Sequence, residues 1–114
     1  MALVHAQPLD VISVRPLATR ITETRTHSLL KTDRVQLMRL VLTAGQTVPE
    51  HQVAGELTLH CLEGQVLVKT PGRQCRLAEG EMMLLPAQEP HALEAQADSS
   101  LLATLLLHQD TPVL

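Results

Sequence analysis

The sequence predicts an all-β domain. Short alternating or apolar segments follow one another at intervals of about 8–12 residues, with turn residues between them. No segment combines apolar residues at helical spacing with capping residues at its ends. At 114 residues the chain has the length of a single domain, which we assign to 1–114. Many short strands with Gly and Pro turns are typical of a β-sandwich or barrel.

N-terminal strands are expected over about residues 10–43, ahead of the main barrel at about 44–107. Residues 21–26 alternate and are rich in β-branched side chains, which favours a strand with one wet face. Residues 34–43 read as a longer strand because an apolar pattern runs up to Ala44 and Gly45.

The barrel segment divides at its turn residues. A hairpin is indicated where Pro71 and Gly72 separate two short strand patterns, and Pro86 and Pro90 bracket a later loop. The expected strands of this segment cover residues 57–62, 65–69, 74–78, 82–85, 91–95 and 101–107.

Composition excludes several functions. The chain is 45% hydrophobic, has a net charge of -3 and contains no Phe, Trp or Tyr. Nucleic-acid binding is not expected, because both aromatic stacking platforms and a basic patch are missing. An aromatic cage for quaternary ammonium and a tyrosine general acid are likewise absent.

We expect a cytoplasmic protein that does not enter a membrane. Residues 1–8 have neither the basic nor the apolar region of a signal peptide. The longest apolar run, 101–107, is far shorter than the ~20 residues needed to span a bilayer. Cys61 and Cys75 lack C-x-x-C spacing and are expected to be free thiols.

Some strands are apolar on both faces, which predicts a homodimer. Residues 40–42, 82–85 and 101–107 show this pattern, whereas a small barrel needs only one apolar face per strand. A symmetric partner would cover the second face. The alternative is a monomer whose own N-terminal strands cover it.

Two of the six histidines stand out as candidate site residues. His5 and His108 fall in tails and His27 in a turn, so we expect all three to face solvent. His51 follows Gly45 by six positions, and His91 opens a strand. A buried imidazole among aliphatic side chains costs desolvation energy unless it is hydrogen-bonded or metal-bound.

Two glycine-anchored blocks enclose these histidines. Gly45, five residues, His51 and a closing Gly64 fit the pattern G-x5-H-x-H-x3–4-E-x6-G. Gly80, five residues, Pro86 and then His91 fit the pattern G-x5-P-x-G-x2-H-x3-N.

Both patterns resemble the paired motifs of small single-domain cupins of the RmlC-like superfamily. This resemblance, which spans residues 45–95, implies a double-stranded β-helix, or jelly-roll barrel. It also implies a metal set of three His and one Glu facing into the barrel. In this sequence the second His of the set falls on Val53 and the Glu on Leu57, so that only His51 and His91 remain.

Strand alternation bears on the missing ligands. Leu57, Leu59 and Cys61 should point inward together, which sends Glu56 and His60 outward. A slip of one residue would expose the apolar set and is therefore resisted. Glu56 stays open as a replacement ligand, because it begins the strand beside a glycine.

Three functional hypotheses follow. In the first, the chain binds a small molecule in an apolar pocket with His51 and His91 as polar anchors and no certain cofactor. That pocket would be lined by His51, Val53, Leu57, Leu59, Cys61, His91 and Leu93.

The second hypothesis is a metal-dependent cupin enzyme of the dioxygenase or isomerase type. His51, His91 and Glu56 would hold Fe, Ni, Zn or Mn in a two-His-one-carboxylate set. An epimerase with a tyrosine acid is disfavoured, since the chain has no tyrosine. The third hypothesis is a structural dimeric domain with a vestigial pocket.

Overall fold

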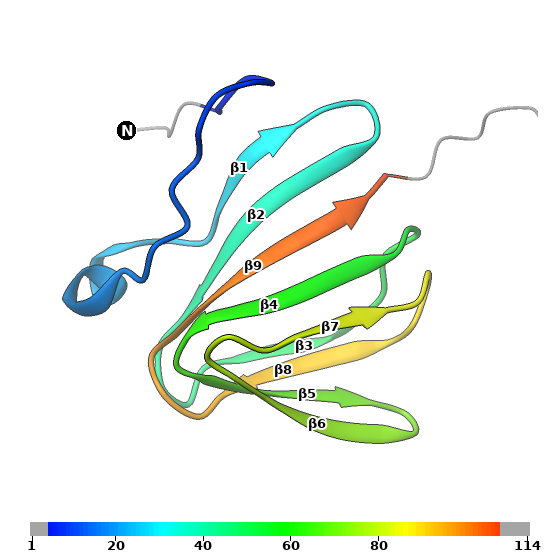
Figure 1. The fold of residues 1–114 in the computed structure, drawn as a ribbon. Coiled ribbons are helices and arrows are strands. Elements are labelled where there is room, and N and C mark those ends of the chain that lie inside the picture. Colours follow the sequence, from blue (N-terminus) through cyan, green and yellow to red (C-terminus); the bar gives the residue numbers. More distant parts are fainter. Residues whose placement is uncertain (1–4, 108–114) are drawn as a thin grey trace, which may run out of the picture.

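The computed structural model describes residues 5–107, and it confirms an all-β fold of two antiparallel sheets (Figure 1). One sheet has the strand order β1-β2-β9-β4-β7 and the other the order β3-β8-β5-β6. Within the described part, the strands are β1 (His27–Lys31), β2 (Val35–Leu42), β3 (Thr47–His51), β4 (Leu57–Glu63), β5 (Gln65–Thr70), β6 (Arg73–Ala78), β7 (Met82–Leu85), β8 (His91–Ala95) and β9 (Ser99–Leu106).

The core lies between the two sheets and is entirely aliphatic apart from one cysteine. On β4 the side chains of Leu57, Leu59 and Cys61 are buried, so the inward set predicted from alternation is confirmed. On β5, Val66 and Val68 are fully buried in the same way. Period-two burial on strands of both sheets fixes the register and thereby the residues that can reach the interior.

The N-terminal segment corrects one expected strand. Residues 21–26 do not form a strand; a 3-10 helix, η1 (Ala18–Glu23), occupies the first half of this range and buries Ile21. His27, expected in a turn, begins β1 and is half-buried. The local pattern of β-branched residues favours a strand, but contacts with distant residues override it.

Glu63 supplies the strongest of these distant contacts. Its carboxylate accepts hydrogen bonds from the backbone N–H of Leu17 at 2.7 Å and of Ala18 at 3.0 Å, and from the Ser100 hydroxyl. Burial alone would raise the pKa of Glu63, but these bonds and the Arg39 cation lower it below its ordinary value. The carboxylate thus holds the start of η1 against the five-stranded sheet.

Arg39 ties down the chain just before this point. It is 5% exposed, and its guanidinium donates hydrogen bonds to the carbonyl oxygens of Val14 and Arg15. Burial lowers the pKa of Arg39, and Glu63 opposes that effect. Across residues 5–107, no helix is long and apolar enough to cross a membrane.

Candidate functional site

The two sequence-predicted histidines meet across a pair of strands. β3 ends at His51 and β8 begins at His91, and the antiparallel register makes them cross-strand partners. Their ring centroids lie 4.3 Å apart, with 57° between the ring planes. The motif spacing predicts neither distance nor tilt; both follow from the pairing of β3 with β8.

Each of these rings is held by its own backbone. The Nδ1 atom of His51 lies 3.1 Å from the carbonyl oxygen of Pro49, and that of His91 lies 2.9 Å from the carbonyl oxygen of Glu89. A carbonyl oxygen can only accept, so Nδ1 must carry the hydrogen in both rings. In the neutral form each Nε2 therefore presents a lone pair as an acceptor or a metal ligand.

His91 lies deeper than its partner, and its free nitrogen still reaches open space. His91 is 2% exposed, whereas His51 is on the surface. Among the described side chains, Arg39 Nε is the buried polar atom without a partner. Within residues 5–107, Nε2 of His91 has no hydrogen-bond partner, and His91 lines the adjacent cavity.

That cavity has a volume of about 230 Å³, and its lining around the two imidazoles is aliphatic apart from Thr26 and Met38. Six of the seven residues expected to line the pocket do so: His51, Val53, Leu57, Leu59, His91 and Leu93. Cys61 does not line it. The thiol lies deeper, fully buried, with Sγ 3.3 Å from the carbonyl oxygen of Glu63, and burial raises its pKa.

Thr26, Val48 and residues from two other strands also line the cavity and were not predicted from the sequence. Met38, Leu40 and Leu42 come from β2, and Ala103 and Leu105 from β9. In both groups the residues are two apart, so the alternation of an inward face was present in the sequence. That pattern was hidden because both strands also carry apolar residues at the intervening positions.

Glu56 does not join the histidines. Its side chain is exposed and lines a separate surface pocket with Leu106 and Leu107. Within residues 5–107, no three His, Cys, Asp or Glu side chains come close enough to hold a metal ion. Two imidazoles are fewer than the three protein ligands of catalytic zinc sites, so the predicted set of His51, His91 and Glu56 does not fit this structure.

The remaining histidines lie away from the cavity. His60 is half-buried on the outer face of β4, beside Met82 and Leu102 of the neighbouring strands. His5 is exposed, and His108 falls outside the described residues. The chemistry available at the barrel mouth is therefore that of two oriented imidazoles in an aliphatic cavity.

The fold and this cavity define a small β-barrel protein with a pocket at one end. A sequence profile described as "Cupin domain" matches residues 38–107, and the chain belongs to that family. Its barrel has the double-stranded β-helix fold of a solved cupin from Methanocaldococcus jannaschii, which has 18% identity and a TM-score of 0.66, with 73% of this chain and 79% of that chain covered. No curated protein matches the chain significantly.

Solved structures agree with this fold. A cupin superfamily protein of Desulfitobacterium hafniense has 20% identity and a TM-score of 0.74, with 90% of this chain and 100% of that chain covered. A conserved protein of unknown function from Streptococcus pyogenes has 20% identity and a TM-score of 0.75, covering 96% and 99%. The DMSP lyase DddQ of Ruegeria pomeroyi has 21% identity and a TM-score of 0.68, covering 76% of this chain and 48% of that one. At these identities the likeness establishes the fold alone.

Proposed function

We propose that the barrel cavity binds a small, mostly aliphatic molecule whose donor group bonds Nε2 of His51 and Nε2 of His91 in alternation. The supporting observation is the pair of backbone bonds at Nδ1, which leaves two imidazole acceptors in a cavity that is otherwise aliphatic apart from Thr26 and Met38. Ligand pockets combine apolar walls with a few placed polar groups in this way.

The cavity limits the size and chemistry of the ligand. Its volume of about 230 Å³ lies just below the ~300–1,000 Å³ of drug-sized sites, so the ligand is small. Aliphatic walls favour an aliphatic body, because each CH₂ group removed from water contributes about 0.8 kcal/mol. A hydroxyl group is the simplest donor, and because it carries one hydrogen it bonds one of the two Nε2 atoms at a time.

Binding of cyclohexanol tests the proposal, with methoxycyclohexane as a matched probe that lacks the donor. We expect the alcohol to shift the imidazole ¹⁵N signals of both Nε2 atoms in NMR spectra. One hydrogen bond contributes about 0.5–1.5 kcal/mol, so the ether should bind roughly 2- to 10-fold more weakly. Equal affinities, or an Nδ1 without its hydrogen in the free protein, would contradict the proposal.

Metal content separates this function from the metal-dependent enzyme. Mass spectrometry on purified wild type and on His51→Ala/His91→Ala should give no stoichiometric metal in either protein. Near-stoichiometric Fe, Ni, Zn or Mn that disappears in the double variant would favour the enzyme instead. In the vestigial-pocket hypothesis, replacing both histidines with Leu leaves the stability of the protein unchanged or improves it, and marked destabilisation would count against that hypothesis. We expect the same replacement to remove the preference for the alcohol.

A further inference from the structure

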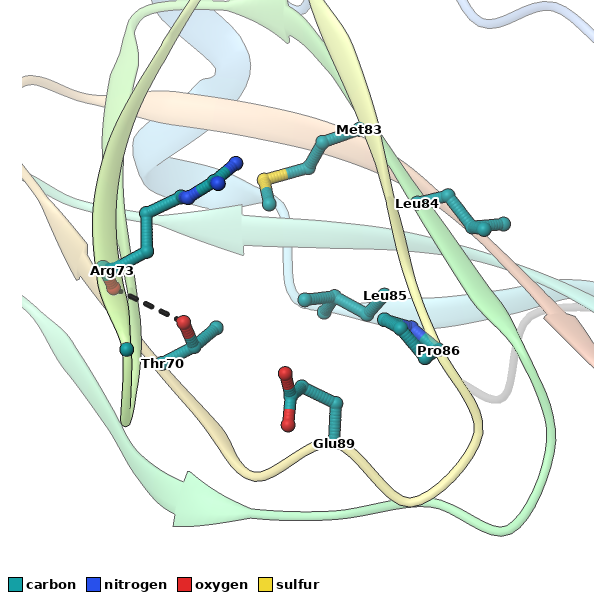
Figure 2. A pocket seen from close by; sticks show the side chains of 8 residues that line it. Thr70, Arg73, Met83, Leu84, Leu85, Pro86 and Glu89 are labelled. Atoms are coloured by element: carbon teal, nitrogen blue, oxygen red, sulfur yellow. Dashed lines mark hydrogen bonds between the residues drawn. The ribbon is translucent and has the colours of Figure 1, made fainter.

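A second cavity shares no lining residue with the histidine cavity. Figure 2 shows the side chains that line it. Its volume is about 400 Å³. The β5–β6 hairpin supplies Thr70 and Arg73, and β7 supplies Met83 and Leu85. The loop after β7 supplies Glu89. The cavity therefore opens where β6 and β7, the edge strands of the two sheets, face each other.

The hairpin register brings Arg73 to this opening. Thr70 pairs with Arg73, two residues beyond the pair of Val68 with Cys75. Val68 is fully buried, and positions two apart on a strand share a face. Thr70 and Arg73 therefore lie on the inward faces of their strands, at the turn end of the hairpin. Figure 2 shows the Arg73 guanidinium, the Thr70 hydroxyl and the Glu89 carboxylate around one space.

Both charges at this opening are unpaired. Over residues 5–107 the ion pair is that of Lys69 with Glu94, at 3.3 Å. Neither the Arg73 guanidinium nor the Glu89 carboxylate has an ion-pair or hydrogen-bond partner in this part of the chain. A cation on the exposed Arg73 and an anion on the half-buried Glu89 thus line the same cavity without bonding each other or another described side chain.

The loop that carries Glu89 is fixed by its backbone. The N–H of Glu89 donates to the carbonyl oxygen of Pro86 at 3.1 Å, and the N–H of Gln88 donates to that of Val53 at 2.8 Å. The carbonyl oxygen of Glu89 in turn accepts the bond from His91. Two backbone bonds and one from the His91 ring therefore hold this turn and fix the position of the Glu89 backbone.

The charge pattern selects among ligand classes. A simple anion would gain from Arg73 and be repelled by Glu89, and a simple cation would meet the reverse. A molecule with both charges satisfies both groups. Arginine binds carboxylates through paired N–H donors, and Glu89 together with the Thr70 oxygen can accept bonds from an ammonium group. Met83 and Leu85 add an apolar wall for an aliphatic or thioether side chain.

We propose that this second cavity binds a free α-amino acid with an apolar side chain. Arg73 takes the carboxylate, Glu89 and Thr70 take the ammonium group, and β7 contacts the side chain. This site does not depend on the function proposed for the histidine cavity, because the two cavities use different side chains.

Calorimetry on the full chain with L-leucine and L-methionine tests the assignment. Leucinamide lacks the carboxylate and N-acetyl-leucine lacks the ammonium group, so each probes one contact on the wild-type protein. A hydrogen bond to a charged group corresponds to about 10- to 100-fold in affinity. We expect each analogue to bind weaker by that factor. An amide that binds as tightly as leucine, or no saturable binding of either amino acid at millimolar concentration, would overturn the proposal.

Variants give a second, independent test. Arg73→Gln should weaken the binding of leucine and leave the affinity for leucinamide unchanged. Glu89→Gln should weaken the binding of leucine and leave the affinity for N-acetyl-leucine unchanged. Arg76→Gln is the matched control, because Arg76 is exposed on the outer face of the same strand. If Arg76→Gln weakens the binding of leucine as much as Arg73→Gln does, the loss comes from the change in net charge, and the proposed site is refuted. Cyclohexanol binding should persist in Glu89→Gln, since the carbonyl oxygen that holds His91 is retained.

Discussion

Gly64 closes the first sequence motif, and its replacement by alanine should destabilise the fold for two separable reasons. Its φ of +85° lies in the left-handed region, which costs a residue with a Cβ about 1–2 kcal/mol. An added Cβ would also lie 2.2 Å from Ser99 Oγ and 2.4 Å from the carbonyl oxygen of Asp98. Overpacking of this kind costs about 1–3 kcal/mol. The sum for Gly64→Ala is about 2–5 kcal/mol.

Gly80, which opens the second motif, provides the matched control. It has the same φ of +85°, but an added Cβ would meet nothing within 4 Å. Gly80→Ala should therefore cost only the backbone part, about 1–2 kcal/mol. Urea unfolding followed by far-UV circular dichroism measures both, since the chain has no aromatic residue for fluorescence. Equal losses in the two variants would show that the Ser99 contact carries no cost and refute the packing argument.

The remaining predictions concern the Glu63 carboxylate and the two thiols. Because the folded pKa of Glu63 is lowered, its stabilising contribution is present above the unfolded value of about 4.3 and is lost as pH falls through the lower folded value. Urea midpoints across that acid range should fall more steeply for wild type than for Glu63→Gln, and parallel curves would contradict this assignment. Iodoacetamide should label half-buried Cys75 in the native protein and fully buried Cys61 only in denaturant; equal native rates would show that the core opens readily.

Alternation and turn chemistry were sufficient to predict most of the barrel. The hairpin at Pro71 and Gly72 and the inward face of β4 both depend on neighbours in sequence, and both are confirmed. The strand predicted over 21–26 is wrong because the 3-10 helix there is held by Glu63, more than 40 residues away. No local pattern reports such a contact.

The candidate site, too, could be predicted from the sequence only in part. The positions of His51 and His91 in the motifs predicted that both face one pocket, and the structure brings them together. Their fixed Nδ1 hydrogens could not be predicted, since the bonds depend on backbone geometry before each strand position. The exposure of Glu56 shows that a glycine neighbour is not enough to turn a strand end inward. The homodimer stays a prediction; Met82, Leu84 and Leu106 are exposed on the five-stranded sheet, as such a contact requires.

The backbone bonds at the two imidazoles determine which parts of the site can change as the sequence diverges. Both acceptors are main-chain oxygens, of Pro49 and Glu89, so no side-chain replacement at either position deletes them. The orientation of the rings is inherited with the path of the chain and not with any neighbouring side chain. The side chains that line the cavity can therefore change, and with them the ligand that fits, while the Nε2 atoms of the two histidines keep their positions.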